Sequence, residues 1–315
     1  MKALVLKGAG TLALDEIDPP IHTPGQTRIK VEIAGLGGSE YQGFANPGMR
    51  PLPSTMGHGF AGTTPDNKRV AVYPLTSCGT CDDCNANFPQ LCEHWQMIGV
   101  QRAGGMAEYV VVPDDALVPL PETMRWEQAT FIEPFANAVN AWARSGFLPG
   151  DRVAIIGAGG IGLGLTACAA QAGCDQIDVM DYAESRQGAA VTLGATRTGL
   201  SLEGHYDRVF DTVGSELTRN MSLQLTRTNG TCVFMGFHQP EQSLNFSQVI
   251  RRQQQLIGAF AYSRQQFEAA ISFASLCPDA WVRNLTFEDV VFQLRAFLDG
   301  DFSTIKAALR PQKID

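Results

Sequence analysis

Short hydrophobic runs separated by polar residues and turns make up roughly the first 120 residues of the chain. Five segments are rich in β-branched residues or alternate with a period of two, namely 1–6, 11–17, 27–35, 69–74 and 107–113. This is the pattern of half-buried β-strands. Glycine and proline separate the segments, and we find no convincing helical periodicity between them. The pattern predicts an antiparallel, barrel-like all-β domain.

Near Trp126 the pattern changes. Residues 126–146 have helical periodicity and end at Gly146, where a C-cap glycine is expected. Continuous apolar strands then alternate with helical segments, which indicates a parallel sheet covered on both faces. The expected strands are 152–157, 177–181, 206–214, 231–237 and 255–260, and the expected helices are 160–172, 184–194 and 215–227. The tail from about Pro278 to Pro311 is mixed, and we expect it to fold back on the first domain.

A glycine-rich turn, GAGGIG, follows the first of these apolar strands directly and opens a helix. In that context the first glycine permits a tight turn, the second lets the backbone approach a pyrophosphate, and the third lets the helix pack close to the strand. The N–H groups at the helix N-terminus favour phosphates. We therefore expect a dinucleotide, rather than an ordinary strand–helix connection, at Gly157, Gly159, Gly160, Ile161 and Gly162.

Asp181 ends the next apolar strand, 19 residues after Gly162. That is close to the offset at which a carboxylate binds the ribose hydroxyls of such a cofactor. Since a carboxylate there repels the additional phosphate of NADP, the sequence favours NAD. Arg186 could reach a 2′-phosphate, although a surface arginine on a helix is the simpler interpretation.

Four cysteines, Cys78, Cys81, Cys84 and Cys92, lie in a polar loop with the spacing C-x2-C-x2-C-x7-C. Four thiolates so spaced can close a tetrahedron around Zn²⁺ with no open position, which is typical of a structural site. Iron–sulfur clusters also use four cysteines, but their usual spacing ends differently. We expect one structural zinc per chain here. The other four cysteines, Cys168, Cys174, Cys232 and Cys277, lie in or beside apolar patterns, and we expect buried thiols.

Composition and charge narrow the possible partners. The chain has 315 residues, of which 24 are Lys or Arg and 32 are Asp or Glu, so its net charge is −8. No basic stripe is available to neutralise phosphates, which argues against nucleic acid. No stretch is long and apolar enough to span a membrane, and the short apolar start is no secretory signal. We expect a cytoplasmic protein of two domains that acts on a small molecule.

The chain as a whole resembles the zinc-containing medium-chain alcohol and polyol dehydrogenases. The resemblance lies in residues 33–41, 56–62, 104–113, 133–141, 210–214 and 305–311, together with the cysteine loop and GAGGIG. It implies an α/β protein with a GroES-like β-rich catalytic domain and a doubly wound Rossmann domain. The corresponding ranges are 1–129 for the catalytic domain, 130–273 for the Rossmann domain and 274–315 for a return to the catalytic domain. A homodimer or homotetramer is also implied.

The sequence departs from this family at the catalytic zinc. The family has GxCGSD and GHE, whereas this chain has Gly37 in place of the ligand cysteine and Gly59 in place of the carboxylate. His58 and Glu133 remain, which are two ligands where a catalytic zinc normally has three. Glu40 lies three residues from the vacated position and is a candidate substitute. We therefore expect catalytic zinc to be impaired or absent.

Without zinc, a side chain has to handle the substrate's proton. The resemblance gives Ser39 a proton-relay role, and His58, Glu133 and Glu40 are the titratable candidates. Three of these residues also have a structural explanation: a turn cap for Ser39, a hydrogen-bonded relic for His58 and a helix start for Glu133.

Three hypotheses for the function remain open. The first is an NAD-dependent dehydrogenase of a secondary alcohol, polyol or sugar. The second is a zinc-free reductase of an activated C=C bond or an iminium, which would not need a Lewis acid, although zinc-free relatives generally lack the cysteine loop. The third is an NAD(H)-binding protein that has lost turnover.

Overall fold

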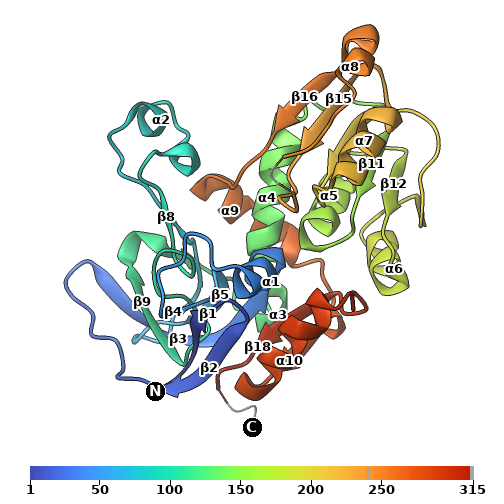
Figure 1. Cartoon of the computed structure of the whole chain (residues 1–315). Helices are drawn as coiled ribbons and strands as arrows, with labels where there is room; N and C mark the ends of the chain where they lie inside the picture. Colours follow the sequence, from blue (N-terminus) through green and yellow to red (C-terminus); the bar gives the residue numbers. More distant parts are fainter. Residues whose placement is uncertain (240, 313–315) are drawn as a thin grey trace. The chain divides into compact units, whose positions relative to one another are not determined.

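The computed structural model describes residues 1–239 and 241–312. The chain folds into two compact units (Figure 1). The first contains Met1–Glu133 and Ser263–Asp315, and the second contains Pro134–Tyr262. The second unit is thus inserted in the sequence of the first. The domain ranges expected from the sequence divide the chain in the same order but at other residues, and their functional assignment stays a prediction.

β-Strands dominate the first unit, as the alternating pattern predicts. The largest sheet has the order β10-β6-β5-β3-β18-β17, with β9 also paired to β3. A three-stranded sheet has the order β2-β1-β4. Their bounds are β1 (Lys2–Gly8), β2 (Thr11–Glu16), β3 (Gln26–Leu36), β4 (Ser54–Thr55), β5 (Gly59–Thr63), β6 (Arg69–Val72), β9 (Tyr109–Pro113), β10 (Leu117–Pro119), β17 (Val282–Leu285) and β18 (Lys306–Leu309).

The C-terminal tail joins this sheet. Strand β18 pairs antiparallel with β3, and β17 pairs parallel with β18. Two helices, α9 (Arg264–Ala274) and α10 (Phe287–Leu298), accompany these strands. Leu285, Val290 and Leu309 belong to the same hydrophobic core as Ile29 and Phe60 of the N-terminal part. The tail thus lies in the same compact unit as the N-terminal part of the chain.

The absence of helices in the N-terminal part was a wrong prediction. Helix α1 (Gly38–Ala45) follows β3 directly and buries Tyr41 and Phe44. It is short, and its two glycines and low amphipathicity hide it from a search for helical periodicity. Its first turn contains Glu40, whose Oε2 accepts a hydrogen bond of 2.9 Å from the backbone N–H of Gly37. This contact closes the N-terminus of the helix in the manner of a capping box.

The cysteine loop forms a small lobe of the first unit. Strands β7 (Leu75–Thr76) and β8 (Gln96–Met97) pair at its base, and α2 (Asp82–Asn85) and a 3₁₀ turn at Pro89–Leu91 lie within it. Figure 1 shows this lobe standing out from the sheets of its unit. It has few apolar residues of its own, so another interaction has to hold it together.

The second unit contains a six-stranded parallel sheet of order β13-β12-β11-β14-β15-β16. This is the doubly wound order of dinucleotide-binding folds, with its crossover between β11 and β14. The strands are β11 (Val153–Ile156), β12 (Ile177–Met180), β13 (Arg197–Gly199), β14 (Tyr206–Asp211), β15 (Thr226–Phe234) and β16 (Gln255–Gly258). Five of them are those expected from apolar runs. The sixth, β13, is too short and polar to be found that way.

Helices α5 (Gly160–Gln171), α6 (Glu184–Thr192) and α7 (Glu216–Leu225) occupy the expected segments, whereas α8 (Phe246–Arg252) was not expected. The helix predicted over 126–146 is in fact two, α3 (Trp126–Ala129) and α4 (Ile132–Arg144). Gly146 lies just beyond α4 with φ of +63°, as expected for a C-cap. Among the described residues, no helix is both long and apolar enough to cross a membrane.

Candidate functional site

The glycine-rich turn lies at the carboxyl end of β11, beside the crossover of the sheet. Gly157 has φ of +93°, and a Cβ there would lie 2.6 Å from Oγ1 of Thr212. At Gly162 a Cβ would lie only 1.8 Å from the carbonyl oxygen of Gly157. Both positions therefore exclude any larger residue, for the reasons the sequence predicted: a tight turn and close helix packing.

Gly159 differs from these two glycines. It is the N-cap of α5, and a Cβ built on it would meet no atom within 4 Å. The protein's own packing therefore does not require glycine there. Open space in front of a helix N-terminus, with unpaired N–H groups behind it, fits the pyrophosphate of a dinucleotide.

Asp181 lies against this turn. Its Oδ2 accepts a hydrogen bond of 2.7 Å from the N–H of Ala158, and its Oδ1 accepts one of 2.9 Å from the N–H of Ala183. Each carboxylate oxygen keeps a further lone pair, so the group can still accept from ribose hydroxyls. Arg186 lies in the first turn of the following helix α6 and is half-buried. The turn and Asp181 together fit the adenosine end of NAD.

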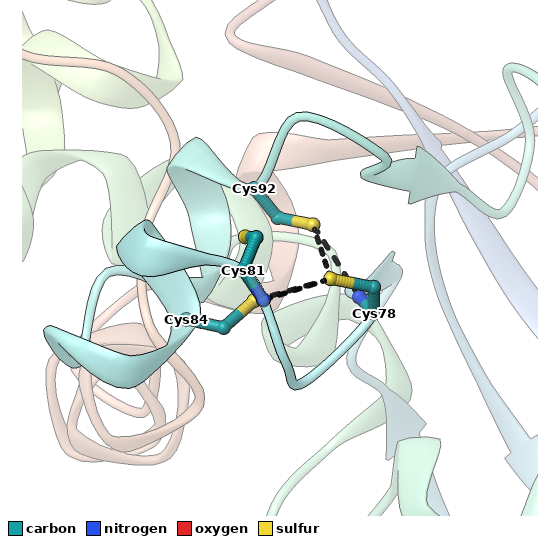
Figure 2. A group of neighbouring side chains, drawn as sticks. All are labelled: Cys78, Cys81, Cys84 and Cys92. Carbon is teal, nitrogen blue, oxygen red and sulfur yellow. Dashed lines mark hydrogen bonds between the residues drawn. The ribbon is translucent and has the colours of Figure 1, made fainter.

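Figure 2 shows the four cysteines of the lobe converging on one point. Their Sγ atoms lie within 4.8 Å of one another. The Sγ of Cys78 is 3.5 Å from that of Cys92 and 4.0 Å from that of Cys84. Four ligands at the usual Zn–S distance of about 2.3 Å would be separated by about 3.8 Å in a tetrahedron. The donor set and its dimensions therefore fit a closed zinc site.

Backbone N–H groups point at these sulfurs. Cys78 Sγ accepts from the N–H of Thr80 at 3.5 Å and of Cys81 at 3.4 Å, and Cys92 Sγ accepts from that of His94 at 3.3 Å. The hydrogen bonds from Thr80 and Cys81 lower the pKa of Cys78 to about 5. Donors around sulfur favour the thiolate form, which is the form that binds metal.

His58 is buried in the first unit, between two carboxylates. Its Nδ1 donates a very short hydrogen bond to Oε1 of Glu40, which also accepts the backbone N–H of His58 at 3.3 Å. Its Nε2 lies 3.4 Å from Oε2 of Glu133. The side chain of Glu40 is fully buried, and that of Glu133 is 13% exposed.

The charges of this group support one another. Burial alone would lower the pKa of His58, but the charges of Glu40 and Glu133 and their hydrogen bonds outweigh it and raise the pKa to about 10. Burial alone would raise the pKa of Glu40, but His58, Arg50 and the N–H of Gly37 lower it to about 2. At neutral pH the histidine is therefore an imidazolium between two carboxylates.

The same geometry does not suit a catalytic zinc. The two ring nitrogens of His58 point in opposite directions, one to each carboxylate, so the three side chains do not converge on a common point. Over residues 1–239 and 241–312, the cysteine lobe is the one group of three or more potential ligands whose donor atoms lie within 4.8 Å of one another. Gly37 and Gly59 have no side chains to complete a set, and a Cβ at Gly59 would lie 3.2 Å from Cβ of Glu133.

Lys306 is a residue of this site that sequence reasoning missed. It is the first residue of β18 and is only 7% exposed. Its ammonium interacts electrostatically with the carboxylates of Glu40 and Glu133. A lysine at the start of an otherwise apolar strand, KAAL, was the available signal.

The structure brings His58, Glu40 and Glu133 together but not Ser39. Ser39 is exposed on α1, and its carbonyl oxygen accepts a hydrogen bond from Arg50 at 3.2 Å. His22, His94, His205 and His238 are exposed, which agrees with their lack of any motif. The four cysteines outside the lobe are buried.

Two family models match the chain. Residues 23–122 match the alcohol dehydrogenase GroES-like domain, and residues 160–275 match the zinc-binding dehydrogenase model. Together they cover more than half of the chain. The chain belongs to the zinc-type medium-chain dehydrogenase/reductase family. It is thus an NAD-dependent oxidoreductase that combines a GroES-like unit with a Rossmann unit, as the motifs predicted.

Relatives of this family match over most of their length. The galactitol 1-phosphate 5-dehydrogenase of Escherichia coli K12 is 28% identical over an alignment of 287 residues, and the match covers 82% of this chain and 83% of the relative. The crystal structure of E. coli galactitol-1-phosphate dehydrogenase matches with a TM-score of 0.89 and 26% identity, covering 99% and 100% of the two chains. A short chain alcohol dehydrogenase of E. coli CFT073, solved with NADH, has a TM-score of 0.88 and covers 98% and 99%. At 24% identity, this last likeness shows the fold alone.

Proposed function

We propose that this medium-chain dehydrogenase interconverts a secondary alcohol of the polyol or sugar type and its carbonyl compound, with NAD(H), and that its catalytic site works without zinc. The observation that carries the proposal is the imidazolium of His58, which lies between Glu40 and Glu133 where a metal would need converging ligands. The polyol class is supported by the relative that dehydrogenates galactitol 1-phosphate. Oligomerisation as a homodimer or homotetramer and a cytoplasmic location remain part of the proposal.

The cofactor assignment rests on the second unit. NAD would supply the acceptor for hydride when an alcohol is oxidised. The N-terminus of α5 and the open face of Gly159 would bind its phosphates. Asp181 would accept from the ribose hydroxyls and repel a 2′-phosphate. Arg186, on α6, is the residue to test if NADP binds instead.

In the first unit, His58 would stabilise charge on the substrate's oxygen. Its Nδ1–H is held tightly by Glu40, while its Nε2–H is only loosely paired with Glu133 at 3.4 Å. A hydrogen bond of that length is weak, so Nε2–H can donate to a substrate oxygen instead. A fixed cation and donor at this point stabilises an alkoxide-like oxygen in a site of low dielectric constant. Glu133 and Glu40 keep the ring charged and oriented, whereas Ser39 is exposed on α1 and has no part in this step.

The cysteine lobe has a structural role in this proposal. One Zn²⁺ held by Cys78, Cys81, Cys84 and Cys92 would have no open position for substrate. Zinc analysis of the purified protein should find one ion per chain. A content of two would contradict the zinc-free catalytic site.

A substrate screen tests the function directly. Alcohols and polyols are offered with NAD, and their carbonyl compounds with NADH, while the nicotinamide absorbance is followed. We expect turnover in the wild type, a loss of about 100-fold or more in kcat for His58→Gln, and unchanged turnover for the exposed control His205→Gln. NADH affinity should be the same in all three proteins.

Two results would favour the other hypotheses. Consumption of NADH with enones or imines, without turnover of any alcohol or carbonyl compound, would identify a C=C or iminium reductase. NADH binding without any turnover would identify a cofactor-binding protein that has lost catalysis.

A further inference from the structure

Lys306 is a buried lysine beside the His58 site. Strand β18 lies between β17 and β3, and the residue after Lys306, Ala307, is paired with Leu36 at the end of β3. The chain then continues from Leu36 into Gly37 and α1, which carries Glu40. The sheet register therefore delivers the lysine to the part of the first unit where Gly37 replaces the family's ligand cysteine.

The side chain is closely packed around its methylene groups. A Cβ built on Gly35 would lie 3.0 Å from Cε of Lys306, 3.2 Å from its Nζ and 3.1 Å from Cβ of Thr130. Residue 35 therefore has to be small for the lysine to occupy its position. A side chain so enclosed has few alternative rotamers, which fixes the location of its ammonium.

The ammonium is nevertheless without a close acceptor. Its charge interacts with Glu40 and Glu133 and with the thiol of Cys277, but none of the hydrogen bonds or ion pairs within residues 1–239 and 241–312 involves its Nζ. The cation of a largely buried side chain that has no protein acceptor is poorly compensated. An oxygen of a bound substrate would satisfy it.

The carboxylates around it already have cationic partners without a metal. Two carboxylates, Glu40 and Glu133, face two cations, His58 and Lys306, and Arg50 adds a further positive charge beside Glu40. The two side-chain cations carry the charge of one divalent ion. They differ from a metal in one respect, because each can give up a proton.

We propose that Lys306 is a catalytic residue, whose ammonium donates a proton to the carbonyl oxygen of the substrate during reduction and whose amine accepts the alcohol's O–H proton during oxidation. This proposal rests on the proposed function. In the oxidation, the carbinol carbon loses its hydrogen as hydride to NAD⁺, the O–H bond breaks, and the C=O bond forms as Lys306 becomes an ammonium. NAD⁺ is reduced and the alcohol oxidised, with no other reactant.

The surroundings of His58 and Lys306 give the two cations different roles in catalysis. Burial lowers the pKa of Lys306 below its ordinary value, although Glu40 and Glu133 oppose the shift. The same carboxylates raise the pKa of His58 to about 10. General acid–base catalysis works best with a group whose pKa lies near the working pH. The pKa of Lys306 is shifted toward that range, and the pKa of His58 is shifted away from it. His58 is therefore the fixed charge, and Lys306 is the group that donates and accepts the proton.

Substitution with two different side chains separates proton transfer from charge alone. Lys306→Met removes both, and Lys306→Arg keeps the charge on a group that does not release its proton. We expect both variants to lose about 100-fold to 10,000-fold in kcat, while NADH affinity stays that of the wild type. Small primary amines should restore activity to Lys306→Ala in proportion to the free amine. The exposed lysine variant Lys68→Met is the matched control and should retain wild-type kcat.

A second measurement does not depend on turnover. In cofactor-free protein with ¹³C-labelled lysine, the Cε resonance that disappears in Lys306→Met should titrate at a lower pH than the other lysines. The titration itself uses the wild-type protein, and Lys306→Arg gives the same assignment if Lys306→Met folds poorly.

The possible outcomes separate the two proposals. Wild-type turnover together with kcat within about threefold in Lys306→Met, or with full activity in Lys306→Arg, would overturn the role of Lys306 and leave the proposed function intact. A Lys306 resonance that titrates with the surface lysines would do the same. A wild-type protein that binds NADH but turns over no alcohol or carbonyl compound would overturn the proposed function, and the role of Lys306 with it.

Discussion

Glu40 holds His58 by two hydrogen bonds to the same oxygen, one from ring Nδ1 and one from the backbone N–H. The second oxygen of Glu40 accepts the N–H of Gly37 at 2.9 Å. The carboxylate therefore ties the start of α1 to the residue before β5. A buried ion pair of this kind is weak evidence for net stability, but removal of one partner leaves an uncompensated charge.

This pair predicts how stability depends on pH. His58 has its pKa raised from 6.5 to about 10, so its contribution is complete below pH 6.5 and is lost as the pH rises toward 10. Glu40 has its pKa lowered from 4.5 to about 2, so its contribution is complete above pH 4.5 and is lost as the pH falls toward 2. We expect the free energy of unfolding, measured with urea, to fall on either side of the range between pH 4.5 and 6.5.

The variant His58→Gln isolates the histidine's share of this effect. It should cost about 3–5 kcal/mol near pH 6, because Glu40 then lies buried without its cation. The difference in unfolding free energy between wild type and variant should shrink as the pH rises from 6.5 to 10. The exposed variant His205→Gln should leave the profile as it is. A difference that stays constant over this pH range would mean that His58 is neutral in the folded protein.

The sequence predicted the fold well where periodicity is strong. The central strands β11 and β12 are mostly apolar and are buried at every residue, so their composition already indicates burial on both faces of the sheet. The elements missed are those that tertiary contacts define. Helix α1 depends on Tyr41 and Phe44 packing into the core, and β13 has three residues whose pairing with β12 is set by the neighbouring strand.

The sequence motifs and the acid–base group around His58 were predictable to different degrees. The cysteines and glycines are contiguous in sequence, and their spacing alone specifies a metal lobe and a phosphate turn. The acid–base group comes from α1, the loop before β5, α4 and β18. Lys306 is 173 residues from Glu133 in sequence, and only the pairing of β18 with β3 brings it there. Such a cluster cannot be seen from spacing.

The cysteine lobe leads to a prediction about metal content. Cys81→Ser removes one of four thiolates, and we expect zinc to fall from one per chain to nearly none, because three sulfurs no longer close the site. Residues 76–97 have little apolar core, so limited proteolysis should then cleave within them first. The matched control is Cys174→Ser, a thiol outside the lobe, which should keep its zinc. Retention of zinc in Cys81→Ser would show that the metal is bound elsewhere.

Asp181 predicts the choice of cofactor. Asp181→Ala removes the acceptor for ribose hydroxyls and the charge that repels a 2′-phosphate. NADH should bind about 10-fold to 100-fold more weakly, which corresponds to one or two hydrogen bonds to a charged group, and NADPH should bind more tightly than before. Nicotinamide fluorescence measures both affinities. Asp181→Asn is the graded control, since its single amide oxygen can keep only one of the two backbone hydrogen bonds to Ala158 and Ala183.

Two substitutions in the glycine turn test phosphate binding and helix packing separately. Gly159→Ala adds a methyl group in open space, so stability should change by less than about 1 kcal/mol, while NADH should bind about tenfold more weakly because the phosphates lose close contact with the backbone. Gly162→Ala places its methyl group 1.8 Å from the carbonyl oxygen of Gly157 and should destabilise the second unit by about 3 kcal/mol or more. Thermal unfolding and NADH titration of both variants measure the contrast. Equal NADH affinity in Gly159→Ala and wild type would mean that the phosphates do not lie at the N-terminus of α5.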